Sequence, residues 1–148
     1  MSRPVKYRRV AWPKPRGFRQ GAGRLEFGDH ALGHVAQQHL EWLAVRGYAG
    51  GTVYQRRIGL LRFFRWCEER ALHDAREITK PILERYQKHL FYYRKKDGRP
   101  LAIQAQARLL ISLKAFFKWL SKENHILSNP ASELELPKTP KPRKIHRF

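Results

Sequence analysis

The sequence has few of the residues that mark several common protein classes. It contains a single cysteine, Cys67, among 148 residues, which excludes an intrachain disulfide and fits a reducing compartment. Cys67 lies in an apolar helical pattern, so we expect it to fill a small space in a core. No stretch approaches the ~20 apolar residues of a membrane span, and the basic N-terminus lacks the apolar segment of a secretory signal. These shortages favour a cytoplasmic protein with no membrane partner.

Acidic residues are also scarce. Asp and Glu number 12 against 31 Lys and Arg, which gives a formal net charge of +19. A chain so charged repels itself and is attracted to polyanions, of which nucleic acid is the first candidate. An anionic membrane surface is a weaker candidate, because the apolar helix faces are sized to pack on one another and leave no face for lipid. The charge also disfavours a simple protein–protein adaptor.

The length fits one domain of ordinary size, and the 42% hydrophobic content is enough for a core. We divide the chain into a basic flexible arm (1–27), a four-helix domain (28–128) and a proline- and lysine-rich linker (129–148). The arm holds prolines, glycines and many arginines but no acid before Glu26, so it is expected to be disordered when unbound. It is either an arm that neutralises phosphate or a solubilising tail.

Four segments have the apolar spacing of amphipathic helices, so the predicted fold class is all-α. The first begins at Asp29 as its N-cap and stops at Gly47, a residue suited to the left-handed position after a helix. Thr52 and Thr79 are expected to cap the second and third, and the fourth covers 101–120. The predicted core residues are Leu32, Val35, Ala36, Leu40, Leu43, Val53, Leu60, Phe64, Cys67, Ile82, Leu83, Tyr86, Leu90, Leu109, Leu110, Leu113, Phe116, Phe117 and Leu120.

The second and fourth helices carry polar and basic residues away from these apolar stripes. Gln55 and Arg62 lie opposite the stripe on the second helix; Gln104, Lys114 and Lys118 do so on the fourth. A helix with one apolar face and one face that attracts anions is a candidate for a DNA groove. The alternative is a face that is only solvated.

Two further features of the pattern leave alternatives open. Gly59 inside a helix costs about 1 kcal/mol relative to Ala, so it marks either close approach of another backbone or a tight helix crossing. The segment 94–100, RKKDGRP, is a turn built on Asp97-Gly98. Its basic residues either contact a backbone phosphate or are merely solvated.

The histidines give no sign of a metal site. His34 and His39 are five residues apart, well off a shared helix face, and with His30 they have no cysteine or acid nearby to complete a ligand set. We therefore expect surface histidines, with no metal and no cofactor.

Taken together, these segments resemble the N-terminal core-binding (SAM-like) domain of the tyrosine recombinase, or phage integrase, family, in its Xer-like form. The resemblance covers about three quarters of the chain and depends on motifs in a fixed order. These are LEWLAVRGYAGGTVYQRRIGLLRFFRWC, then EITKPILERYQKHL, then ARLLISLKAFFKWLSKENHILSNPASELELPKTPK.

The resemblance implies a four-helix domain with basic, extended arms that forms half of a clamp around duplex DNA. In such domains the second and fourth helices face the major groove. The implied DNA-binding residues are Thr52, Gln55, Arg56, Arg57, Arg62, Gln104, Gln106, Arg108, Lys114 and Lys118. The role of Arg56 is open, because relatives often have an aromatic residue there.

The family's chemistry belongs to a C-terminal domain, in which a tyrosine attacks the scissile phosphate. None of the tyrosines in this sequence has the Arg–His setting that a nucleophile requires, so we expect a chain that binds double-stranded DNA near the nucleoid without cutting it. Other recombinase protomers in a synaptic complex are the second implied partner. The alternatives are an RNA- or ribosome-associated binder and an enzyme completed by a separate catalytic subunit.

Overall fold

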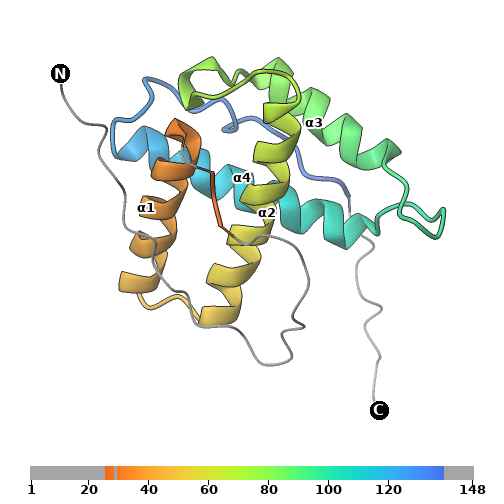
Figure 1. Ribbon diagram of the computed structural model, residues 1–148, viewed down its shortest axis with the longest axis horizontal. Helices are drawn as coiled ribbons and strands as arrows, with labels where there is room; N and C mark the ends of the chain where they lie inside the picture. The colour runs from red at the N-terminus through yellow and green to blue at the C-terminus, as the bar shows by residue number, and fades with distance from the viewer. Residues whose placement is uncertain (1–25, 29, 139–148) are drawn as a thin grey trace, which may run out of the picture.

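The computed structural model describes residues 26–28 and 30–138, and this part of the chain is all-helical (Figure 1). It contains no β-strand; an isolated bridge joins Arg94 to Pro100. The predicted all-α, four-helix class is therefore confirmed. The predicted arm, except for its last two residues, and the end of the predicted linker lie outside the described residues. The elements are α1 (Ala31–Val45), α2 (Gly50–Glu68), the 3₁₀ turn η1 (Ala75–Glu77), α3 (Lys80–Tyr92) and α4 (Ile103–Lys122).

Helices α1 and α2 run antiparallel side by side, and α4 packs across both of them (Figure 1). The α1–α2 connection reverses the chain at Gly47, whose φ of +86° is the left-handed conformation that glycine adopts without strain. The amide of Tyr48 donates to the carbonyl of Leu43 at 3.1 Å, and that of Gly47 to Ala44 at 3.0 Å. This is the predicted glycine stop of the first helix.

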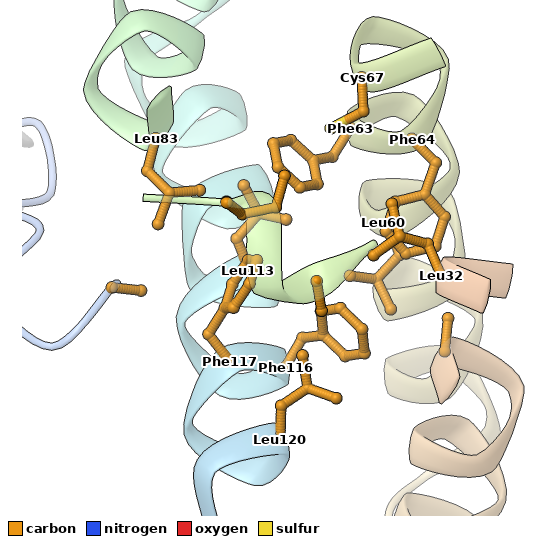
Figure 2. Close-up of a cluster of buried hydrophobic side chains, with 14 of the residues drawn as sticks. Leu32, Leu60, Phe63, Phe64, Cys67, Leu83, Leu113, Phe116, Phe117 and Leu120 are labelled. Atoms are coloured by element: carbon orange, nitrogen blue, oxygen red, sulfur yellow. The ribbon is translucent and has the colours of Figure 1, made fainter. Parts of the chain in front are cut away.

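The core takes buried side chains from all four helices and mixes aliphatic with aromatic groups (Figure 2). Phe63 packs edge-on against Tyr86 with ring centroids 4.9 Å apart, and against Phe117 at 6.2 Å. Cys67 is completely buried here, as predicted. Burial raises the pKa of its thiol to about 12, so it stays protonated and packs as an apolar group. Most of the predicted core residues are buried; Val35, Ile82 and Leu109 are only partly so.

Two of the predicted helix starts are wrong. The N-cap of α1 is His30, whose Nδ1 accepts from the amide of Gly33 at 3.0 Å; Asp29 lies outside the described residues. Helix α2 begins at Gly50 rather than after Thr52, with Ala49 at its N-cap. The amide of Val53 donates to the carbonyl of Ala49 at 3.0 Å, so the two glycines that indicated a turn form helix instead. Thr79 occupies the N-cap position of α3, as predicted.

The prediction of surface histidines is wrong for His39, which is 1% exposed. Its ring lies 5.2 Å from that of Trp119, 5.4 Å from Phe116 and 6.3 Å from Trp42. The helical spacing explains the burial, because position 39 falls between the buried positions 36 and 43 on one face of α1. Burial first, and then the charge of Arg56, lowers the pKa of His39 to about 4, so the ring is neutral at physiological pH.

Helices α2 and α4 cross closely at Gly59. A Cβ added there would lie 2.9 Å from both Cβ and Oγ of Ser112, closer than real side chains approach. Of the two alternatives for Gly59, close approach of another backbone or a tight helix crossing, the structure therefore favours the tight crossing. It brings the outer faces of α2 and α4 next to each other.

The chain after α4 returns to pack on the domain. Asn129 accepts from the amide of Ala131 at 2.9 Å in a tight turn, and both Ala131 and Leu134 are buried. The ammonium of Lys114 donates to the carbonyl of Leu134 at 2.6 Å. The packed unit thus extends to Leu134, beyond the boundary predicted at residue 128. No described helix combines the length and apolar character that crossing a bilayer requires.

Candidate nucleic-acid interface

A shallow groove of about 440 Å³ runs between α2 and α4 beside the Gly59 crossing. We call it the α2–α4 groove. It is lined by Thr52, Gln55, Arg56, Arg62, Leu101, Ala105, Arg108, Leu109, Ile111 and Ser112. Three of these residues are arginines and none is acidic, so the groove attracts anions.

The groove brings together predicted site residues that are far apart in the sequence. Thr52, Gln55, Arg56 and Arg62 come from α2, and Arg108 comes from α4. Gln104 is exposed one helical turn before Arg108 and so faces the same side of α4.

Arg56 lies at the centre of this surface. It is half-buried, and its Nη1 is 3.5 Å from the carbonyl oxygen of Ile111 on α4. Burial lowers its pKa, and the nearby Tyr48 acts in the opposite direction. Even so lowered, an arginine remains charged at physiological pH. Arg56 therefore supplies a fixed positive charge where the two helices meet.

Arg62 is held by an aromatic side chain. Its guanidinium carbon lies 4.5 Å from the centre of the Tyr93 ring, a cation–π contact. The ring of His89 is 6.0 Å from that of Tyr93 on the same side of α3. Tyr93 therefore has an arginine and a histidine beside it. Both contacts are made by the face or edge of the ring, so they orient Arg62 and Tyr93 rather than activate the phenol oxygen.

A second hollow of about 490 Å³ adjoins the groove and shares Arg56 and Ile111 with it. Lys114 and Lys118, both predicted site residues, lie here, away from the groove itself. Lys118 is exposed. Lys114 already donates to the carbonyl of Leu134, so its charge is only partly offered to an outside anion.

The structure removes Arg57 and Gln106 from the candidate surface, because each is only 5% exposed. Arg57 donates to Oε1 of Gln37 at 2.9 Å and lies 5.0 Å from the ring centre of Phe27. Burial lowers its pKa to about 10, while the charge of Glu26 acts to raise it. Gln106 donates from Nε2 to the carbonyl of Leu101 at 3.0 Å. Both side chains support the fold beneath the surface.

The burial of Arg57 and of Gln106 could have been predicted from helical spacing. Position 57 falls on the buried stripe with 53, 60 and 64, and position 106 falls on the stripe with 110, 113 and 117. The sequence reasoning missed Ser112, which is buried in the groove floor and donates to the carbonyl of Arg108 at 3.1 Å. Its proximity to Gly59 could not be seen without the helix crossing.

Among the described residues, no group of three His, Cys, Asp or Glu side chains is placed to hold a metal ion. The lining of the α2–α4 groove offers hydrogen-bond donors from the guanidinium groups of Arg56, Arg62 and Arg108 and from the amide of Gln55.

The chain is similar in sequence to tyrosine recombinases. It is 55% identical over 116 residues to tyrosine recombinase XerC 2 of Ralstonia nicotianae, a match that covers 77% of this chain and 33% of that protein. It is 32% identical over 117 residues to tyrosine recombinase XerC of Leptospira interrogans, covering 78% and 36%. The chain therefore carries a Xer-like tyrosine recombinase N-terminal domain.

The Xer-like match agrees with the resemblance inferred from the motifs, in both the kind of protein and the share of the chain. The chain spans about a third of the length of these recombinases. No protein-family model matches the chain, and no solved structure does.

Proposed function

We propose that this domain binds duplex DNA as the core-binding part of a Xer-like recombinase, in site-specific DNA recombination. The observation that carries the proposal is the α2–α4 groove, whose lining has three arginines and no acidic side chain. The second support is the similarity to tyrosine recombinases XerC 2 and XerC.

Phosphate contacts would supply most of the affinity. Arg56, Arg62 and Arg108 can each neutralise a phosphate, so binding would weaken steeply as salt rises. The N-cap residues of α2 and α4 are Ala49 and Ala102, which offer no capping side chain, and neither helix has an acid in its first turn. Their N-terminal amides can therefore add hydrogen bonds to phosphate near the groove.

A few side chains would determine which DNA base sequence the domain prefers. Glutamine can pair with adenine and arginine with guanine in the major groove, and each good pair discriminates by about 1–3 kcal/mol. Gln55 and Gln104 are exposed and are the candidates for adenine; Arg62 and Arg108 are those for guanine. Thr52 at the start of α2, and Lys118 beyond the groove, are assigned to the DNA backbone.

In this proposal the domain binds DNA as one part of a larger assembly. Its partners would be duplex DNA and other recombinase protomers, at the nucleoid of the cytoplasm. Strand cleavage would belong to the part of such recombinases that this chain does not match.

The test compares two double variants that each change two exposed polar residues. Gln104→Ala with Arg108→Ala alters the proposed surface, whereas Glu84→Ala with Arg85→Ala alters the outer face of α3. Affinity for labelled duplex DNA is measured by fluorescence anisotropy, with far-UV circular dichroism to show that both variants fold. We expect the first pair to weaken binding at least tenfold, in line with one lost base or phosphate contact per residue, and the second to leave it within about twofold.

Equal binding by the two variants would overturn the assignment of the groove. A wild-type domain that prefers structured RNA to duplex DNA in direct competition would overturn the proposed partner and favour the RNA-binding alternative.

A further inference from the structure

The turn between α3 and α4 is a strongly basic element that the proposed groove does not include. We call residues 94–100 the basic turn. It contains Arg94, Lys95, Lys96 and Arg99, and every residue in it is exposed. Its only acid, Asp97, uses Oδ1 to accept from the backbone amide of Arg99 at 2.9 Å. The turn therefore presents net positive charge at one end of the domain.

The basic turn has a defined conformation. The amide of Lys95 donates to the carbonyl of Arg99 at 2.8 Å, and that of Gly98 donates to Lys95 at 2.8 Å. Gly98 has a φ of +83°, which closes the turn in the left-handed region. Because the backbone of the turn is already ordered, binding an anion there would cost little further backbone entropy.

Both ends of the basic turn are tied to the α2–α4 groove. On the α3 side, Tyr93 lies under the guanidinium of Arg62, a residue of the groove. On the α4 side, Gln106 donates to the carbonyl of Leu101, which also lines the groove. Figure 1 shows the turn projecting beyond the N-terminal end of α4. An extended polyanion lying along the groove would meet the turn as it leaves.

We propose that the basic turn is a second contact to the phosphate backbone of the duplex held in the α2–α4 groove. This inference depends on the proposed function. The ammonium groups of Lys95 and Lys96 act as point charges on flexible stems, which suits phosphates rather than base edges. The turn thus adds affinity and salt dependence without adding sequence preference.

The experiment removes two charges at two places and compares the results. Lys95→Ala with Lys96→Ala changes the turn; Arg85→Ala with Lys88→Ala removes the same charge from the outer face of α3. Binding to one duplex is measured between about 50 and 200 mM salt, where each lost phosphate contact makes the slope of log affinity against log salt shallower by about 0.9.

The turn variant is expected to bind roughly tenfold more weakly at the lower salt, with a slope shallower by about 1.8. Its ranking of duplexes of different sequence should match that of the wild type. The α3 variant should retain the wild-type slope. Equal slopes for the two variants, with wild-type binding intact, would overturn this inference alone. Failure of the wild type to bind duplex DNA would instead overturn the proposed function.

Tyr93 is a positioning residue in this account, because it joins the turn to Arg62. Tyr93→Leu removes the ring, whereas Tyr93→Phe keeps it and removes only the hydroxyl. We expect Tyr93→Leu to make the salt slope shallower and Tyr93→Phe to restore wild-type behaviour. If both variants bind as the wild type does, the stack does not position the turn.

Discussion

Three arginines on α2 meet three different surroundings within two helical turns. Arg56 is half-buried at the meeting point of α2 and α4, Arg57 is buried against Gln37 and Phe27, and Arg62 lies over Tyr93. Only the first and third line the groove. A positive charge therefore becomes a candidate DNA contact through its position around the helix, and not through its place in a basic segment.

His39 gives the domain a specific weakness toward acid. Its pKa is about 4 in the folded protein against an ordinary 6.5, so the unfolded chain takes up a proton first. The contribution of this pKa difference to the free energy of unfolding is fully present above pH 6.5 and is lost as the pH falls toward 4. The loss corresponds to roughly 3 kcal/mol. It adds to whatever the other titrating groups contribute.

Replacing His39 isolates this effect. We expect His39→Leu to lose roughly 3 kcal/mol less than the wild type between pH 7 and pH 4, measured by urea unfolding followed through circular dichroism. Parallel losses in the two proteins would show that His39 is not the group responsible.

At the scale of the helices, apolar spacing predicted the existence and the inward faces of all four. It was less successful at their ends. Gly50 and Gly51 indicated a turn by their own preferences, yet they form the first turn of α2. Local propensity amounts to about 1 kcal/mol per residue, which tertiary packing readily overrides. The docking of Leu134 on the domain was invisible for a similar reason, since it depends on contacts from α4.

The candidate surface was only partly predictable. The outer faces of α2 and α4 could be found from spacing, and they supplied Gln55, Arg62 and Gln104. The groove itself depends on how closely the helices cross at Gly59 and Ser112. That closeness is a property of two elements together, and no pattern within either helix specifies it.

Because the start of α2 is uncapped, we predict that one substitution there raises stability and lowers DNA affinity. Ala49→Asp would place a carboxylate at the N-cap, where it can accept from the first amides and interact favourably with the helix dipole. We expect stability to rise by about 1 kcal/mol. We also expect DNA affinity to fall several-fold, because the new charge repels phosphate beside Thr52. Thermal unfolding and anisotropy on the same sample measure both.

A parallel change in the two quantities would contradict this prediction. Ala49→Ser is the matched control, because it caps the same amides without adding charge. It should stabilise the domain while reducing DNA affinity less than Ala49→Asp does.

For the whole molecule, the formal charge of +19 exceeds what the groove accounts for. The groove contributes three arginines and the basic turn four more cations. These two elements lie next to each other, and this arrangement suits a long polyanion better than a small anionic ligand. Charge spread in this way steers and strengthens association, but it does not choose a sequence.

The measurement that tests the central claim most directly is selection of random duplexes by the wild type and by the Gln104→Ala, Arg108→Ala variant, followed by sequencing. The account predicts that the wild type enriches a short site of about one helical turn and that the variant loses preference at particular positions within it. Identical enrichment by the two proteins, or no enrichment by the wild type together with equal binding to RNA, would contradict it.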